Sequence, residues 1–408
     1  MAIRSPRNRS QRITAWMQAL GPGIITAALV FGPSKMTVAT KLGAEFGYGL
    51  LWVVVAAIFF MMVYTSMSAR IGLASEVSIL DLIRQKWGTT AGVMIGIGVF
   101  LVAACFQAGN SIGAGIALEE LTHTARIPWI LFFNLLGIVL LFFRSFYRVL
   151  EKVMLALIMM MLIAFIVTSL TTRPSFAAIT HGLVPAVPGG SWQLVTALTA
   201  SCFALVAAFY QAYLIQERRR KSVDQAVEDR SFPGLLILGI MTALVMICAA
   251  TVMHPQGIKV TNASDMGRAL EPLFGHYASV FFLVGLFGAS FSSLIGNSTL
   301  GGTVFSDALG YGSKLDSLPV RLLIALVMIT GAVVAILFGS LPIQLIVFAQ
   351  SITIFIIPLI GLAIFLIAND RQIMGARTNG LLANLTGGLG LLLVVALAIH
   401  SFNVLFLK

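Results

Sequence analysis

A lysine stands within an otherwise apolar segment that begins near Trp16. It is Lys35, and it closes the run Gly32-Pro33-Ser34-Lys35. A fixed ammonium at bilayer depth costs several kcal/mol or more unless it has a partner or a function. The Gly-Pro pair in the same turn interrupts a helix and frees backbone groups. An interrupted helix with a charge at the interruption is how secondary transporters build a substrate site.

Three interpretations of Lys35 follow from its surroundings. The half-helix that starts here directs its free N–H groups and positive dipole end at the break, and Ser34 and Thr37 add hydroxyls. This combination suits a small anion, most naturally a carboxylate. Alternatively, the ammonium replaces a bound cation and neutralises carbonyl dipoles, so that the substrate is neutral. In the third interpretation Lys35 snorkels toward an aqueous vestibule.

Composition sets the class of the protein. Hydrophobic residues make up 59% of the 408 residues and charged residues only 10%. Apolar runs of about 20 residues recur along the chain, so we expect a polytopic helical membrane protein. The charged loops divide the chain into eleven expected spans. These are 16–45, 47–69, 91–118, 127–143, 153–171, 192–215, 233–252, 277–305, 319–338, 341–368 and 380–404.

The distribution of Lys and Arg among the loops predicts the orientation of the chain in the membrane. If the N-terminus is cytoplasmic, most of them fall on the cytoplasmic side, which places the C-terminus outside after eleven spans. Residues 1–15 then form a retained cytoplasmic tail, and the expected location is a bacterial-type inner membrane. The net charge of +11 follows from this topology. We interpret the cluster Arg218–Lys221 as binding to anionic lipid of the bilayer rather than to nucleic acid.

The sequence shows no pattern typical of an enzyme. Cys105, Cys202 and Cys248 lie within expected spans and lack metal-ligand spacing. There is no Walker loop, no Cys/His cluster and no nucleophile–base pair. We expect no cofactor, no resident metal and no catalytic residues.

Several segments resemble the Nramp family of metal transporters over nearly the whole chain. They are Gly21-Pro22-Gly23, Gly43 to Trp52, Ser68 to Gly72, Ile112 to Leu118, Leu214-Ile215-Gln216 with the following Arg run, Leu270 to Gly275, and Asp370-Arg371 to Met374-Gly375. The resemblance implies an all-α, LeuT-like fold. Its inverted repeats would be 16–171 and 192–368, with 380–404 as an additional helix. Spans one and six would be unwound at the midplane, with substrate between the breaks.

This chain departs from the family at the metal site. The family has Asp-Pro-Gly-Asn in the first break, where the Asp and Asn bind the ion. Gly32 stands at the Asp position here and Lys35 at the Asn position. Two unit charges about 4 Å apart repel by about 4 kcal/mol at an effective dielectric near 20, and a divalent ion meets about twice that. A divalent cation also needs ligands such as carboxylates to replace its hydration shell.

The other family positions change as well. Ala204, Leu205 and Val206 align with the family's Met-Pro-His in span six. Further changes are Gln211 at a second family His and Gln107 and Asn110 at an acidic pair associated with proton movement. Ser201 and Ala204 would flank the sixth-span break if it persists without Gly or Pro. In span ten, Gln350 is the better candidate for lining the cavity.

These residues lead to one functional expectation with two alternatives. We expect a secondary transporter for a small organic anion. The resemblance adds 5-oxoproline as one candidate, because divergent Nramp-like permeases accompany its utilisation genes, and bicarbonate-sized anions are within range. The alternatives are a divalent metal ion (Mn²⁺, Fe²⁺ or Mg²⁺) and a neutral solute. Coupling to protons, to sodium or to no ion remains open, and no oligomeric state is predicted.

Overall fold

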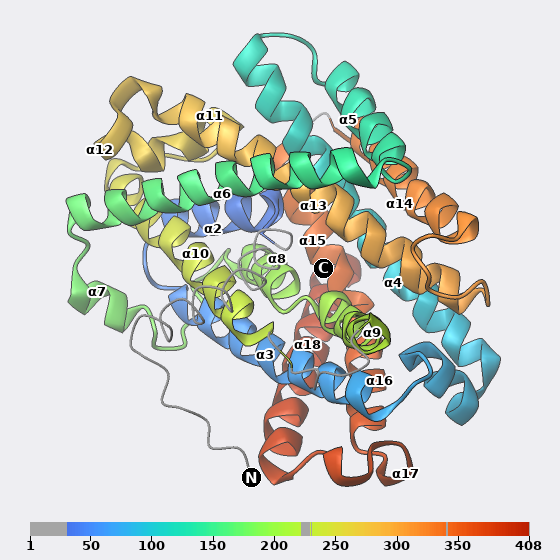
Figure 1. The fold of residues 1–408 in the computed structure, drawn as a ribbon. Helices are drawn as coiled ribbons and strands as arrows, with labels where there is room; N and C mark the ends of the chain where they lie inside the picture. The colour runs from blue at the N-terminus through green and yellow to red at the C-terminus, as the bar shows by residue number, and fades with distance from the viewer. Residues whose placement is uncertain (1–30, 222–228, 230, 340–341, 408) are drawn as a thin grey trace, which may run out of the picture.

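The computed structural model describes residues 31–221, 229, 231–339 and 342–407. The expected tail, 1–15, and the first part of span one, 16–30, lie outside the described residues. Within the described part, all regular secondary structure is helical (Figure 1). The expected all-helical class is therefore confirmed.

The long helices follow the expected spans. They are α2 (Pro33–Phe46), α3 (Leu51–Ala74), α4 (Ile79–Thr122), α5 (Arg126–Leu140), α6 (Arg144–Thr172), α8 (Trp192–Cys202), α9 (Leu205–Lys221), α10 (Ser231–Val252), α13 (Ala278–Ala308), α14 (Leu318–Leu337), α15 (Pro342–Ile352), α16 (Ile357–Ala368) and α18 (Leu381–Phe406). Short helices connect them: α7 (Phe176–His181), η1 (His254–Gln256), α11 (Ala263–Gly267), η2 (Arg268–Leu270), α12 (Glu271–Phe274), η3 (Gly275–Tyr277), η4 (Thr353–Phe355), α17 (Arg371–Met374) and η5 (Gly375–Arg377).

Eight helices of the described chain are long and apolar enough to cross a bilayer. The bent pair α15–α16 makes a ninth crossing if counted as one, and α5 is a shorter apolar helix. Because span one is described only in part, these residues do not fix the predicted number of eleven crossings. α4 is longer than its predicted limits of 91–118, and it contains a non-helical Gly88 with φ of 86°.

Glycine lets the central helices approach closely. α13 packs along α4, and a Cβ placed on Gly96 would lie 2.0 Å from the Ala308 Cβ. A Cβ on Gly301 would lie 2.3 Å from the Ala103 Cβ. Small residues at helix interfaces are how membrane helices gain packing energy without a hydrophobic driving force. Figure 1 shows α6 lying across α10 and α13, both of which it contacts.

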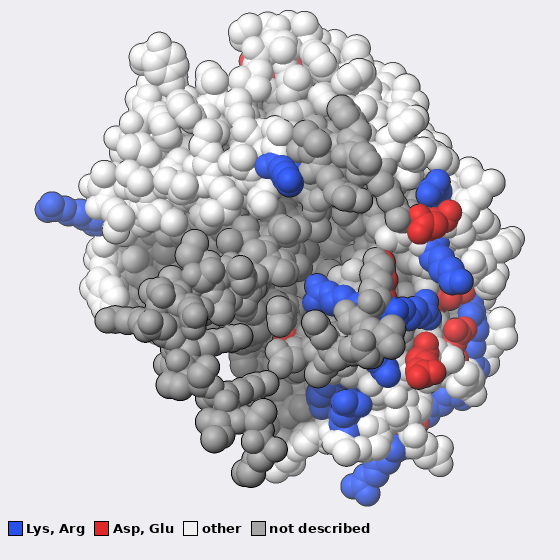
Figure 2. Space-filling view, viewed as in Figure 1, with Lys and Arg blue, Asp and Glu red and all other residues white. Residues whose placement is uncertain are grey.

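Charge is concentrated at one end of the helix bundle. In Figure 2, most of the visible Lys, Arg, Asp and Glu side chains of the described chain gather around the end of α9, the start of α4 and α17. Several of the arginines there bind backbone carbonyls: Arg219 donates to Leu73 O at 3.3 Å, and Arg70 donates to Arg377 O at 3.1 Å. These cations therefore also satisfy carbonyls at helix ends.

Candidate functional site

The first break ends where α2 begins. Gly32 is extended (φ −93°, ψ 178°), and Pro33 is the first helical residue, where its missing N–H is harmless. Lys35 lies in the first turn and is only 5% exposed. The unpaired N–H groups of this turn carry the positive end of the helix dipole. The ammonium and the dipole therefore place positive charge in the same region.

The sixth span is also interrupted, although no Gly or Pro marks the place. α8 ends at Cys202 and α9 starts at Leu205. Between them Phe203 has non-helical angles (φ −86°, ψ 61°), and Leu205 N donates to Phe203 O at 2.9 Å. The Phe203 ring is fully buried, with its centroid 5.3 Å from that of Tyr64. We attribute the break to this aromatic packing.

The two breaks lie next to each other. α2 packs against α8, and Lys35 and Ala204, one from each break, line the same cavity. The unwound segments of spans one and six, expected to enclose the substrate, are thus neighbours in the described structure.

The tenth span is broken too, which sequence reasoning missed. The predicted continuous span 341–368 is instead α15, η4 and α16, with a bend of 43°. Gln350 lies near the end of α15, and its Nε2 donates to the Ser34 Oγ at 2.9 Å. This buried hydrogen bond joins the tenth span directly to the first break.

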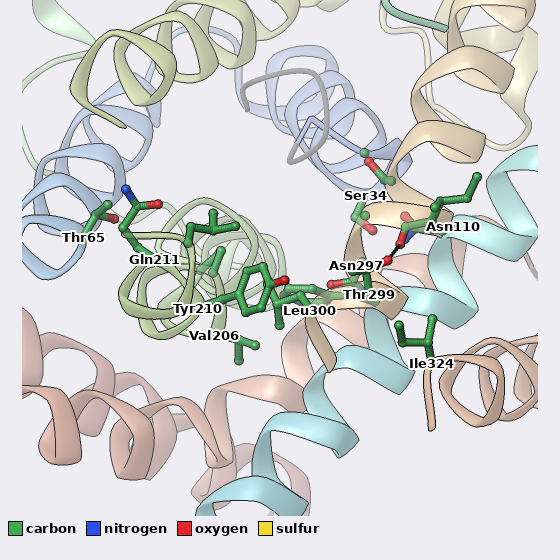
Figure 3. Close-up of a pocket in the computed structure, with 18 of the residues that line it drawn as sticks. Ser34, Thr65, Asn110, Val206, Tyr210, Gln211, Asn297, Thr299, Leu300 and Ile324 are labelled. Atoms are coloured by element: carbon green, nitrogen blue, oxygen red, sulfur yellow. Dashed lines mark hydrogen bonds between the residues drawn. The ribbon is translucent and has the colours of Figure 1, made fainter. Parts of the chain in front are cut away.

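A cavity of about 380 Å³ lies at these breaks (Figure 3). Seven of the predicted residues line it: Gly32, Ser34, Lys35, Asn110, Ala204, Gln211 and Gln350. In Figure 3, Gln211 and Thr65 lie beside each other on one side of the cavity, and Asn110 lies on the opposite side. Tyr210 points from α9 toward Thr299 and Leu300 of α13. The lining combines amides and hydroxyls with a larger apolar surface.

Among the described residues, the charged side chains of the lining are two cations and one acid. The cations are Lys35 and Arg321, and the acid is Glu217. A further carboxylate, that of Asp229, accepts a hydrogen bond at 3.2 Å from the Nε2 of Gln211, which itself lines the cavity. Lys35 lies at the breaks, whereas Glu217 lies near the end of α9 and Arg321 near the start of α14. The deep part of the cavity is therefore positive.

The position of Gly32 leaves little space for a carboxylate side chain. A Cβ placed there would lie 3.0 Å from the Ser293 Oγ and 3.1 Å from the Asn110 Oδ1. Among the described residues, no three His, Cys, Asp or Glu side chains come close enough together to hold a metal ion. The donors around the break are hydroxyl and amide groups beside an ammonium, which is a poor set for a divalent cation.

Four predicted residues do not line the cavity. Pro33 packs toward Gly113 of α4, where a Cβ would lie 2.5 Å from the Pro33 Cβ. Ser201 is buried, and its Oγ donates to Leu198 O at 3.0 Å within its own helix. Thr37 and Gln107 are fully buried, and their side-chain polar atoms find no hydrogen-bond partner within the described chain.

Other lining residues were not predicted. Thr65, Tyr210, Glu217 and Arg321 line the cavity, as do Ser293, Asn297 and Thr299 of α13. The sequence of α13 is polar at Ser293, Asn297 and Thr299, but only the packing of the helix shows that these positions face the cavity. The only feature of the sequence that could have indicated Tyr210 as a lining residue is its position next to the predicted Gln211.

Comparison with known proteins identifies the family. The model of the natural resistance-associated macrophage protein-like (Nramp) family matches residues 23–403. The chain belongs to the Nramp family. It is 28% identical over 396 residues to the divalent metal cation transporter MntH of Deinococcus radiodurans, covering 93% of this chain and 88% of that protein. MntH of Klebsiella pneumoniae is 26% identical over 385 residues, covering 93% and 92%.

Solved Nramp and related structures share the fold. The manganese transporter of Eremococcus coleocola, in a mutant form, superposes with a TM-score of 0.72 at 18% identity, covering 98% of this chain and 89% of that one. Mhp1, a nucleobase-cation-symport-1 family transporter, gives 0.62 at 14% identity, covering 96% and 93%. The expected LeuT-like fold is thereby confirmed, and the chain is a membrane transporter of the Nramp family rather than an enzyme.

Proposed function

We propose that this Nramp protein is an alternating-access transporter that carries a small organic anion through the central cavity. The observation that carries the proposal is the buried Lys35 at the wall of a cavity whose described lining has one acid, Glu217, at its far end. An ammonium, a helix N-terminus and the hydroxyl and amide groups of Ser34, Asn110 and Gln350 are suitable partners for a carboxylate.

The fold supports the transport mechanism. In transporters with discontinuous helices, substrate binds at the breaks and one part of the bundle rocks against the other. We propose that residues 16–171 and 192–368 are the two inverted repeats and that α18 stands outside them. The α8–α9 and α15–α16 breaks both belong to the second repeat.

A divalent metal ion is the second candidate, and the relatives favour it. The MntH proteins of D. radiodurans and K. pneumoniae are named divalent metal cation transporters. Ser34, Asn110 and Ser293, whose side chains carry oxygen atoms, line the cavity near the break. Against this candidate, Lys35 repels a cation, and no three His, Cys, Asp or Glu side chains of the described residues are grouped so as to hold a metal ion.

Uptake by purified protein in proteoliposomes separates the candidates. We expect radiolabelled small monocarboxylates, among them 5-oxoproline and bicarbonate, to enter and ⁵⁴Mn²⁺ not to enter. Imposed proton and sodium gradients then identify the coupling ion. Saturable ⁵⁴Mn²⁺ uptake without carboxylate uptake would overturn the anion proposal and favour the metal candidate. Liposomes without protein serve as the control.

A further inference from the structure

A second cavity lies away from the transport site, between α3, α8 and α18. Its volume is about 210 Å³. Ala57, Thr199 and Leu393 line its deep part, one from each helix. Nearly all of its surface is apolar. An engineered apolar cavity of about 150 Å³ stays dry and binds benzene or xenon, so this one is large enough for an apolar ligand.

Aromatic residues gather at one end of this cavity. Trp192 is the first residue of α8, and Trp52 is the second residue of α3. The Trp52 Nε1 donates to Ala186 O at 2.9 Å, and the Trp192 and His400 ring centroids are 4.1 Å apart. Because Trp concentrates at membrane–water interfaces, this end lies at headgroup level and the deep end points toward the bilayer core.

His400 supplies a polar group at that end. Its Nε2 is buried and finds no hydrogen-bond partner among the residues that the structure describes. A buried polar atom without a partner costs about 1–3 kcal/mol. The occupant of the cavity should therefore carry an apolar chain with a polar acceptor or donor at the depth of His400.

The bilayer supplies such a molecule. α18 is largely exposed, and Leu389, Leu392 and Ile399 face outward with exposures of 58%, 66% and 58%. These side chains are in contact with lipid tails if α18 spans the membrane. The glycerol ester carbonyls of phospholipids lie at the boundary between headgroups and acyl chains, which is the level of the Trp residues.

We propose that this cavity binds one phospholipid, with an acyl chain between α3, α8 and α18 and an ester carbonyl accepting a hydrogen bond from the His400 Nε2. The site adjoins α8, the half-helix that ends at the transport site. It is independent of the proposed substrate, so failure of either proposal leaves the other intact.

Native mass spectrometry of the purified protein with phosphatidylglycerol tests the proposal. Ala396 lines the cavity, so Ala396→Phe should fill it and remove one tightly retained phospholipid. Ile399→Phe, on the exposed side of the same helix, is the matched control and should retain it. His400→Leu should raise the apparent Kd of this lipid about threefold to tenfold, as the loss of one hydrogen bond predicts.

Fluorescence in brominated phospholipid bilayers gives an independent measurement. Bromine near the ester should quench a larger fraction of the tryptophan fluorescence in the wild type than in Trp192→Phe, because Trp192 lines the occupied site. This comparison remains valid if Ala396→Phe does not fold. Equal lipid retention by the wild type and His400→Leu would overturn the proposal. Retention of detergent or free fatty acid in place of phospholipid would overturn it too.

Discussion

At the scale of single residues, the contact between Ser34 and Gln350 joins two interrupted helices. Their hydrogen bond of 2.9 Å is buried and links residues 316 positions apart. Interhelical hydrogen bonds in membrane proteins contribute about 0.6 kcal/mol on average. The bond is therefore a modest stabiliser that fixes the position of one break relative to the other.

A double-mutant cycle measures this link. We expect Ser34→Ala and Gln350→Ala each to lower the free energy of unfolding, with a coupling energy of about 0.6 kcal/mol between them. Unfolding in detergent followed by circular dichroism gives the values. As a control, Ser34→Ala combined with Ser351→Ala should be additive, because the Ser351 Oγ donates to Val347 O and Gln193 O and not to Ser34. Additivity for Ser34 and Gln350 would show that the bond does not form.

The site residues that could be predicted from the sequence are those whose types are unusual for their surroundings. Lys35 was conspicuous as a charge in an apolar run, and Asn110 and Gln350 as amides in spans. Tyr210 and Thr65 were missed because an isolated Tyr or Thr in a helix is common, and only packing determines whether it meets a cavity. Thr37 and Ser201 were expected at the site but lie turned away from it, buried among neighbouring helices.

At the scale of helices, Pro marks two of the interruptions: Pro33 opens α2, and Pro358 lies in the first turn of α16. Only the Gly32-Pro33 signal led to a prediction. At the break in span six, the Phe203 ring is buried against Tyr64, a tertiary contact that no local pattern reveals. The bend after α15 follows Gln350, whose carbonyl accepts a hydrogen bond of 2.7 Å from the Thr353 Oγ1. Helix identity and approximate limits were predictable because hydrophobicity determines them.

The ion pair between α4 and the start of α17 predicts that the stability of the fold depends on pH. The Lys86 ammonium donates to the Asp370 carboxylate, and this hydrogen bond holds the pKa of Asp370 below its ordinary value. A lowered pKa stabilises the fold at neutral pH, and this stabilisation is lost as the pH falls below about 4. Asp370→Asn should thus lower stability at pH 7 by at most about 1 kcal/mol, because Lys86 is partly exposed.

Thermal unfolding at several pH values tests this dependence. The Tm of the wild type should exceed that of Asp370→Asn at pH 7, and the two should converge as the pH approaches 3. Asn retains the cap that Asp370 forms for α17, so the comparison isolates the ion pair. A Tm difference that does not change between pH 7 and pH 3 would contradict the assignment.

At the scale of the whole molecule, the cavity extends from the breaks toward the charged end of the bundle. Glu217 and Arg321 line it there, and that end is cytoplasmic if the positive charges determine the topology. With that predicted orientation, the site faces the cytoplasm. Membrane-impermeant thiol reagents can establish this orientation in a variant lacking the native cysteines.

Thr299→Cys, which lines the cavity, should react with such a reagent added from the cytoplasmic side. Gln372→Cys in α17 should react from the same side, and Gln256→Cys in η1 from the opposite side; both positions are exposed. Labelling of Gln256→Cys and Thr299→Cys from one common side would reverse the assigned direction of the cavity.

The fold and the chemistry of the site point to different substrates. The scaffold is that of Nramp transporters, whereas the first break carries Gly32 and Lys35, and the described residues contain no group of three His, Cys, Asp or Glu side chains that could hold a metal ion. The central claim is that the positive charge of Lys35 binds an anionic substrate. Removing only that charge is the most direct test.

That measurement is carboxylate uptake by the wild type, Lys35→Met and Lys35→Arg in matched proteoliposomes. The loss of a charged hydrogen bond of about 1.5–3 kcal/mol predicts a ten- to hundredfold lower affinity for Lys35→Met. Lys35→Arg should retain more activity. Lys41→Met, which loses an ion pair with Glu45 within α2 and a hydrogen bond of 3.4 Å to Val260 O, should resemble the wild type. Undiminished carboxylate uptake by Lys35→Met would contradict the account.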